Sequence, residues 1–208
     1  MNIEKKINKI IIISSPSGAG KTTICNYLVK KLNNIDLSIS YTTRSKRTNE
    51  LNSKDYYFVN NDKFTKLKNK NFFIETANVF NNLYGSPYKN ISNAFKKNHH
   101  ILFDIDWQGA RKLRKKYKNT KIIDIFILPP NKKELKNRLI KRGRDNNKEI
   151  NLRMSLALNE IKHYKEYKYV LINESIKNTI NNLIKIIDFE ILIEKNNNKL
   201  NSNLKKFQ

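Results

Sequence analysis

The sequence predicts an α/β fold in which helices flank a parallel sheet. Apolar runs of strand length alternate with helical patterns along the chain. A helix between two strands carries the chain back over one face of the sheet, and the strands therefore run parallel. The 208 residues suffice for one compact domain with a substantial core, and a hydrophobic content of 38% excludes wholesale disorder.

The elements of this core follow one another in a regular order. A helical pattern at Lys21–Asn33 follows the first apolar run. The strands of the sheet are predicted at Lys9–Ser14, His100–Ile105, Lys121–Leu128 and Tyr169–Ile172. We expect these four strands to lie side by side in one sheet.

Two helix starts are predicted from capping residues. Asn131 followed by Glu134 forms a pair that is similar to a capping box. Ser86 followed by Pro87 is typical of an N-cap and a first helical residue. We therefore expect helices to begin directly after Asn131 and Ser86.

The pattern changes between the first helix and the second long strand. Short segments rich in Ser, Thr, Tyr and Asn, such as Ser38–Thr43 and Tyr56–Val59, predict the short strands of an inserted lobe. Further along, the polar segment Arg142–Lys148 is expected to be a mobile loop between two helices. The Asn- and Lys-rich residues 196–208 are expected to form a flexible tail.

The chain is strongly basic, with a formal net charge of +24. Taken alone, such a charge indicates binding to nucleic acid or to an anionic membrane. The positive residues are nevertheless spread along the whole chain, and they accompany an excess of Asn and Ile of the kind that an A/T-biased coding sequence produces. We therefore expect most lysines to form a solvated surface, with no dedicated nucleic-acid partner and no membrane partner.

Cysteine content and apolar runs favour a cytoplasmic protein. The single cysteine, Cys25, cannot form an internal disulfide, so the fold does not depend on an oxidising compartment. The run Ile10–Ile13 is too short for the apolar region of a signal peptide, and no other stretch could span a bilayer. The sequence leaves the choice between a monomer and a homo-oligomer open.

A glycine-rich segment, SSPSGAGKTT at Ser14–Thr23, lies between the first apolar run and the first helical pattern. This strand, loop and helix context is that of a P-loop, in which backbone N–H groups and the helix N-terminus bind phosphate. Lys21 would reach the β- and γ-phosphates, and the Thr22 hydroxyl would ligate Mg2+. The strict pattern has Gly where this chain has Ser15, but the complete GAGKT outweighs that mismatch. The predicted ATP-binding residues are Ser15, Pro16, Ser17, Gly18, Ala19, Gly20, Lys21 and Thr22.

Phosphoryl transfer depends on charge neutralisation and in-line positioning, so arginines are expected near the P-loop. Arg138, Arg142 and Arg153 flank the predicted mobile loop, with Arg138 and Arg142 on one helical face. In so basic a chain, surface charge is an alternative explanation of about equal weight. Their position beside a candidate lid favours a catalytic role.

Two aspartates end the run ILFDID, at the carboxyl end of a predicted parallel strand, where α/β proteins bind ligands. Asp104 is a candidate to act on Mg2+, directly or through water. Alternatively, an aspartate at the end of this strand caps the helix that starts near Gln108. Acidic side chains are scarce in this chain, so we expect Asp104 and Asp106 to have a function.

The order of these motifs resembles one family closely, the guanylate kinases. The resemblance covers most of the chain, in the order that the family has. The matching segments are SPSGAGKT (15–22), SISYTTRSKR (38–47), KDYYFV (54–59), FIETA (73–77), LYGSP (83–87), LFDIDWQG (102–109), FILPP (126–130), RLIKRG (138–143) and INLRM (150–154).

The resemblance implies a P-loop NTPase-type parallel sheet flanked by helices, with an inserted GMP-binding lobe and a lid. It also implies that the chain transfers the γ-phosphoryl group of ATP to GMP, giving ADP and GDP, with Mg2+ as the cofactor. A single domain at residues 1–195 would comprise a core (8–36, 98–136 and 165–195), the GMP-binding lobe (37–90) and the lid (about 137–155).

The resemblance further implies roles for individual residues. Lys21, Arg138, Arg142 and Arg153 would act on the transferring phosphoryl group, and Thr22 and Asp104 would hold the metal. The implied GMP-binding residues are Arg44, Arg47, Tyr56 and Tyr84 at the phosphate, Ser40, Glu75 and Ser86 at the base, and Asp106 near the nucleoside. Where the family usually has Pro-Gly near the end of the TTR segment, this chain has Lys46 and then Thr48, Asn49 and Glu50, so this loop is expected to be less rigid.

Three other functions remain open at this point. A guanylate-kinase-like binding module without catalysis would have a damaged P-loop, whereas Lys21 and Thr22 are present here. Another small-molecule kinase on the same scaffold would lack the base-facing set Ser40, Glu75 and Ser86. A nucleic-acid-binding role rests on the net charge alone.

Overall fold

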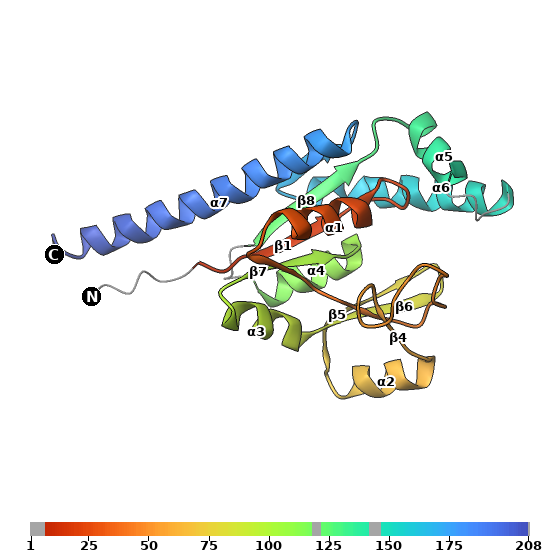
Figure 1. Ribbon diagram of the computed structural model, residues 1–208, viewed down its shortest axis with the longest axis horizontal. Helices are drawn as coiled ribbons and strands as arrows, with labels where there is room; N and C mark the ends of the chain where they lie inside the picture. The colour runs from red at the N-terminus through yellow and green to blue at the C-terminus, as the bar shows by residue number, and fades with distance from the viewer. Residues whose placement is uncertain (1–6, 118–121, 142–146, 208) are drawn as a thin grey trace.

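The computed structural model describes residues 7–117, 122–141 and 147–207. Its central sheet has five strands in the order β2-β7-β1-β8-β9, and every pairing is parallel (Figure 1). The predicted parallel α/β fold is therefore confirmed. The strands are β1 (Ile10–Ser14), β2 (Ile35–Leu37), β7 (His100–Asp104), β8 (Ile122–Leu128) and β9 (Tyr169–Ile172).

Four of these strands lie where the apolar runs predicted them. The fifth, β2, was not predicted, because its three residues are too few to show a strand pattern. It pairs with β7 at the edge of the sheet and receives its register from that neighbour. Its position as a strand is thus decided by tertiary contact.

Helices cover both faces of this sheet. On one face lie α1 (Lys21–Lys31) and α7 (Ile176–Leu204), and on the other lie α3 (Tyr88–Lys96) and α4 (Trp107–Lys116) (Figure 1). Because side chains alternate along a strand, the isoleucines of β1 divide between the two cores: Ile11 and Ile13 pack toward α1 and α7, whereas Ile10 and Ile12 pack toward α3 and α4. A run of buried isoleucines is what a strand covered on both faces requires.

A second sheet forms a lobe that is inserted between β2 and α3. Its strand order is β4-β3-β6-β5, and α2 (Asn61–Asn69) covers it. Inside the lobe, the rings of Phe64 and Phe73 stack with their centroids 4.7 Å apart. The strands are β3 (Tyr41–Thr42), β4 (Tyr57–Phe58), β5 (Phe73–Val79) and β6 (Asn82–Pro87).

Two further helices extend from the sheet beyond β8. These are α5 (Lys132–Lys141) and α6 (Asn147–Ile161), which pack on each other through Leu135, Leu139, Ile150, Met154 and Ala157. The short helix η1 (Lys162–Glu166) then leads into β9. Most of the predicted mobile loop, residues 142–146, lies outside the described residues, and Asn147 and Lys148 belong to α6 instead of a loop.

One of the two predicted helix starts is confirmed and the other is wrong. The Asn131 side chain accepts a hydrogen bond from the Glu134 backbone at 2.8 Å, as an N-cap does. Ser86, in contrast, belongs to β6, and Pro87 is the N-cap of α3. The Ser86 hydroxyl donates to Glu75, so it is not available to cap the helix.

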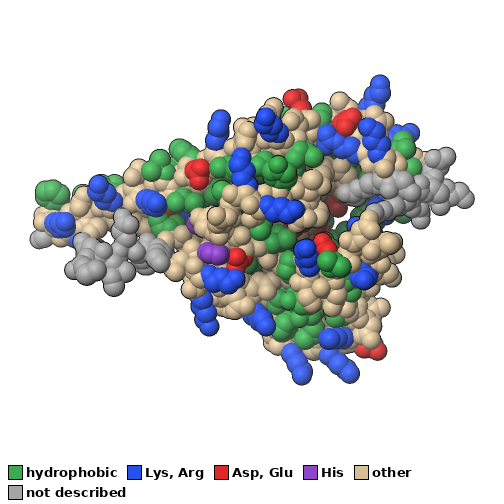
Figure 2. All heavy atoms as spheres, in the orientation of Figure 1, with side chains coloured by type: hydrophobic (Ala, Val, Ile, Leu, Met, Phe, Trp, Pro, Cys, Tyr) green, Lys and Arg blue, Asp and Glu red, His purple; other side chains and the backbone are tan. Residues whose placement is uncertain are grey.

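The C-terminal segment also differs from expectation. The flexible tail was expected from residue 196, but α7 continues to Leu204. A helix that is already formed adds a residue at little cost, since each addition brings one more backbone hydrogen bond. Within residues 7–117, 122–141 and 147–207, no helix is long and apolar enough to cross a membrane. Figure 2 shows Lys and Arg side chains distributed over the visible face, which agrees with a solvated basic surface.

Candidate active site

The P-loop joins β1 to α1 and has the backbone that phosphate binding needs. Gly18 and Gly20 have φ of 93° and 94°, a left-handed conformation that side chains with a Cβ rarely adopt. A Cβ at Gly18 would lie 3.0 Å from side-chain carbons of Leu135 and Leu139, so this loop also packs closely on α5. Ser15 is not among the residues with positive φ, which explains why the strict glycine of the motif is dispensable here.

Lys21 and Thr22 converge on Asp104 at the end of β7. The Lys21 ammonium lies 2.5 Å from one carboxylate oxygen of Asp104, and the Thr22 hydroxyl donates to the other at 3.0 Å. Burial lowers the pKa of Lys21, but the adjacent carboxylate more than offsets this, so the pKa is raised and Lys21 is charged. The sequence predicted Lys21 and Thr22 from the P-loop and Asp104 from the end of a later strand, and the structure brings the two motifs together.

The Thr22 and Asp104 oxygens are of the kind that Mg2+ prefers. Within the described residues, no group of three or more His, Cys, Asp or Glu side chains could hold a metal ion by itself. Mg2+ usually takes only one or two protein ligands and completes its coordination with water and substrate phosphates. The pair therefore fits a metal ion that arrives with a nucleotide.

A cleft lies between the P-loop and the inserted lobe. The lobe contributes basic and aromatic side chains to this cleft, opposite the P-loop. Arg44, Arg47, Tyr56 and Tyr84 all line this cleft. The Arg44 guanidinium carbon lies 5.4 Å from the ring centroid of Tyr56, and the Tyr56 and Tyr84 rings meet edge to face at 5.9 Å. Burial raises the pKa of Tyr56, so its hydroxyl keeps its proton and can donate to an anion.

The loop that carries these arginines is held in place by Glu50. One carboxylate oxygen of Glu50 lies 2.7 Å from the Arg44 guanidinium, and the other accepts from the Arg47 backbone at 2.8 Å. Burial alone would raise the pKa of Glu50, but these hydrogen bonds lower it, so the carboxylate is ionised. The loop at Thr48 and Asn49, which was expected to be less rigid, is therefore held by the hydrogen bonds of Glu50.

A buried acid, Glu75, lies deeper in the same lobe. Its side chain is 3% exposed and accepts a hydrogen bond from the Ser86 hydroxyl at 2.5 Å. Ser86 and Ser40 are 2.9 Å apart, and because the one Ser86 proton points to Glu75, Ser40 must be the donor to Ser86. Burial raises the pKa of Glu75 to about 7, and the charge of Asp106 adds to that shift. Ser40 and Glu75 line the cleft, whereas Ser86 lies behind Glu75.

Asp106 combines a place in the cleft with the capping role that was the alternative for these aspartates. Its side chain accepts from the Gly109 backbone at 2.9 Å, so Asp106 is the N-cap of α4. A Cβ at Gly109 would lie only 2.6 Å from a carboxylate oxygen of Glu75. The glycine therefore allows α4 to approach the buried acid closely.

The three arginines predicted to act on the phosphoryl group are placed differently. Arg153, on α6, lines the cleft. Arg138, on α5, lies beside the P-loop, where its guanidinium donates to the Asn173 carbonyl at 3.0 Å and lies 3.5 Å from the Ala19 carbonyl oxygen. It does not line the cleft in this structure. Arg142 lies outside the described residues.

Several residues that line the cleft were not predicted from the sequence, and two of them, Glu160 and Phe80, make contacts there that matter. Glu160, on α6, accepts a hydrogen bond from the Ser17 backbone at 2.9 Å, which ties α6 to the P-loop. Phe80, at the tip of the β5–β6 hairpin, also lines the cleft. The scarcity of acids, 18 Asp and Glu against 42 Lys and Arg, was a weak signal for Glu160. No local motif marked Phe80.

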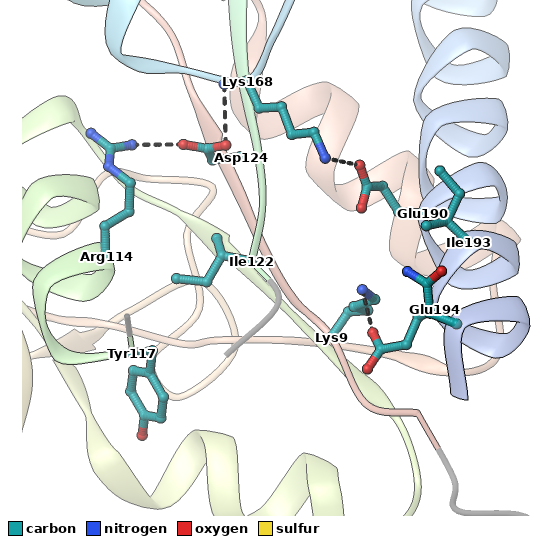
Figure 3. Close-up of a pocket in the computed structure, with 10 residues that line it drawn as sticks. Lys9, Arg114, Tyr117, Ile122, Asp124, Lys168, Glu190, Ile193 and Glu194 are labelled. Carbon is teal, nitrogen blue, oxygen red and sulfur yellow. Dashed lines mark hydrogen bonds and ion pairs between the residues drawn. The ribbon is translucent and has the colours of Figure 1, made fainter. Parts of the chain in front are cut away.

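A second hollow lies at the other end of the parallel strands, near the start of β1 and β8 (Figure 3). Figure 3 shows the charged side chains of this hollow pointing at one another: Lys9 pairs with Glu194 at 2.5 Å, and Arg114 with Asp124 at 3.0 Å. Lys168 likewise pairs with Glu190. These pairs hold α7 and α4 against the sheet, so a structural role accounts for them.

Known proteins resemble this chain in both sequence and fold. The family model described as guanylate kinase matches residues 7–190. A guanylate kinase of Rickettsia prowazekii (strain Madrid E) is 44% identical over 178 residues, which cover 86% of this chain and 89% of the relative. One of Blochmanniella floridana is 47% identical over 165 residues, 78% of each chain. The crystal structure of guanylate kinase from Anaplasma phagocytophilum aligns with a TM-score of 0.74 and 36% identity, over 89% of this chain and 87% of that chain.

Proposed function

This chain belongs to the guanylate kinase family, and we propose that its cleft is where the γ-phosphoryl group of ATP is transferred to GMP, giving ADP and GDP. The chain is an ATP:GMP phosphotransferase. One observation carries the assignment to the cleft: a P-loop and a lobe that contains two arginines and a buried acid face each other across the same space. Donor and acceptor bound on opposite walls would be held for in-line transfer.

On the donor side, the P-loop binds the triphosphate. Backbone N–H groups of a P-loop bind phosphate oxygens, and the N-terminus of α1 would add its partial positive charge. When ATP binds, the Lys21 ammonium would leave the Asp104 carboxylate and contact the β- and γ-phosphates. These phosphates carry more negative charge and therefore attract the ammonium more strongly. Thr22 and Asp104 would hold Mg2+, which neutralises phosphate charge when bound.

On the acceptor side, the lobe binds GMP from both ends. Arg44 and Arg47, with the Tyr56 and Tyr84 hydroxyls, bind the phosphate dianion. The ionised Glu75 accepts hydrogen bonds from the guanine N1–H and 2-amino groups. Adenine offers a lone pair at N1 and no 2-amino group, so a buried carboxylate rejects it.

Arginines on α5 and α6 would act on the γ-phosphoryl group during its transfer. Arg153 is directed into the cleft, where a guanidinium stabilises the charge that spreads over the transferring phosphoryl oxygens. Arg138 is close to the P-loop and would reach the nucleotide after a change of partner. Closure of α5 and α6 over the nucleotides would exclude water, which would otherwise accept the phosphoryl group.

A cytoplasmic location is part of this proposal. Cys25 is the single cysteine of the chain and it is buried, so the fold needs no disulfide and no oxidising compartment. The intracellular nucleotide pool would also supply both substrates.

The test is a coupled assay of ADP formation with ATP and a panel of nucleoside monophosphates, with and without Mg2+. We expect turnover with GMP, at least a thousandfold lower kcat/KM with AMP, and loss of activity when Mg2+ is chelated. A reaction without acceptor measures ATP hydrolysis as the control. If GMP does not stimulate ADP formation, the assignment is wrong.

A further inference from the structure

The β5–β6 hairpin turns through two residues, Phe80 and Asn81, between the paired residues Val79 and Asn82. Both turn residues have positive φ, 52° and 59°. This turn fits the twist of the two strands, but it favours Asn, Asp or Gly at both positions. Asn81 suits its place, whereas a bulky aromatic residue in the left-handed region is uncommon. Local turn chemistry therefore does not account for Phe80.

Burial does not account for it either. Phe80 remains 37% exposed at the hairpin tip and packs into neither core of the central sheet. Its ring instead lines the cleft, and the Arg153 guanidinium carbon lies 5.6 Å from the ring centroid. This contact joins the lobe to α6, two parts of the molecule that reach the cleft from different sides.

We propose that Phe80 is a positioning residue for phosphoryl transfer, whose ring holds the Arg153 guanidinium in the cleft. The inference rests on the proposed function, in which Arg153 acts on the transferring group. A guanidinium that stacks on a ring has its N–H donors in its own plane, so stacking itself is compatible with hydrogen bonds to phosphate oxygens.

The contact also links the two sides of the cleft mechanically. GMP binds to the lobe that carries the hairpin, and Arg153 lies on the helix that Glu160 ties to the P-loop at Ser17. With the ring against the guanidinium, the lobe that binds the acceptor also keeps the Arg153 side chain in the cleft. The arginine is then in place when the acceptor is, which limits transfer to water.

Three substitutions separate this role from a structural one. Phe80→Asn introduces a residue that the turn favours, Phe80→Leu keeps apolar bulk without a ring, and Phe80→Tyr keeps the ring. We expect Phe80→Asn and Phe80→Leu to lower kcat by about 2- to 30-fold, the range that a cation–π contact is worth. Phe80→Tyr should stay within about twofold of wild type. KM for GMP should change little in all three, because the guanine and phosphate contacts lie elsewhere.

A comparison of the unfolding temperature with kcat distinguishes a positioning role of Phe80 from a structural one. Phe80→Asn should unfold at the same or a higher temperature than wild type, because Asn adopts the left-handed backbone conformation of this position more readily than Phe does. Its kcat should nevertheless fall. Phe189→Leu is the matched control: Phe189 is 55% exposed on α7, away from the cleft, and its loss should leave kcat unchanged. Wild-type kcat in both Phe80→Asn and Phe80→Leu would overturn the inference.

A double-mutant cycle with Arg153→Ala shows whether Phe80 acts through that arginine. In the Arg153→Ala background, Phe80→Leu should have no further effect on kcat. Full additivity of the two substitutions would overturn the inference while leaving the proposed function intact. Failure of the wild-type chain to convert GMP would instead overturn the proposed function, and this inference with it.

Discussion

Replacement of Glu75 by Gln tests how the lobe recognises guanine. Burial, with a contribution from Asp106, raises the pKa of Glu75 from its ordinary 4.5 to about 7. A carboxyl group with this pKa is about 90% ionised at pH 8 and about 10% ionised at pH 6. Only the ionised form accepts hydrogen bonds from both guanine donors. The affinity of wild type for GMP should therefore fall about tenfold from pH 8 to pH 6 through this group.

In Glu75→Gln, that contribution to the pH dependence should disappear. The amide nitrogen would also face groups of guanine that donate, so the preference for GMP over AMP should fall at least about tenfold. The assay is kcat/KM for GMP and AMP at pH 6, 7 and 8 with saturating ATP. The phosphate of GMP titrates near pH 6 itself, but equally for both proteins, so the ratio of wild type to variant isolates Glu75.

The same substitution has a predicted effect on stability. Because the folded-state pKa of Glu75 lies above its unfolded value, its contribution to stability is fully present below about pH 4.5 and is lost as the pH rises through about 7. A shift of this size corresponds to about 3 kcal/mol. In urea unfolding, the free energy of unfolding of Glu75→Gln should therefore increase relative to that of wild type as the pH rises from 4.5 to 8. An unchanged GMP-to-AMP ratio and an unchanged pH profile in this variant would refute the reasoning.

Three further substitutions address other parts of the molecule. Lys21→Ala should lower kcat by about 100- to 1000-fold, the size of a transition-state charge contact, with an unchanged circular dichroism spectrum; wild-type turnover would contradict the P-loop assignment. Gly109→Ala places a Cβ 2.6 Å from the Glu75 carboxylate and should raise KM for GMP but not for ATP, and equal effects on both would count against this geometry. Lys9→Met leaves Glu194 without the Lys9 ion pair and should lower the free energy of unfolding by about 1–3 kcal/mol. Its kcat should stay normal, and a fall in kcat at full stability would show that the second hollow serves the reaction.

Local signals in the sequence determined four of the five strands of the central sheet and the P-loop. The period of the apolar residues places strands and helices because each pattern extends over neighbouring residues. The loop was predictable for the same reason, since Gly18 and Gly20 adopt left-handed conformations that depend on their own backbone. The resemblance to guanylate kinases added the residues that are expected to bind GMP, which neither composition nor periodicity identifies.

The tertiary structure alone decided how the cleft residues act on one another. Ser17 and Glu160 are 143 residues apart, yet they form one hydrogen bond, and the Phe80 ring meets Arg153 from a different part of the fold. The raised pKa of Glu75 likewise follows from burial beneath α4 and from the charge of Asp106. Such contacts depend on the packing of separate elements, and a sequence pattern reports only what neighbours along the chain have in common. The sequence therefore determined which chemical groups are present, and the packing of the lobe, α4 and α6 around the P-loop decided their charge and their partners.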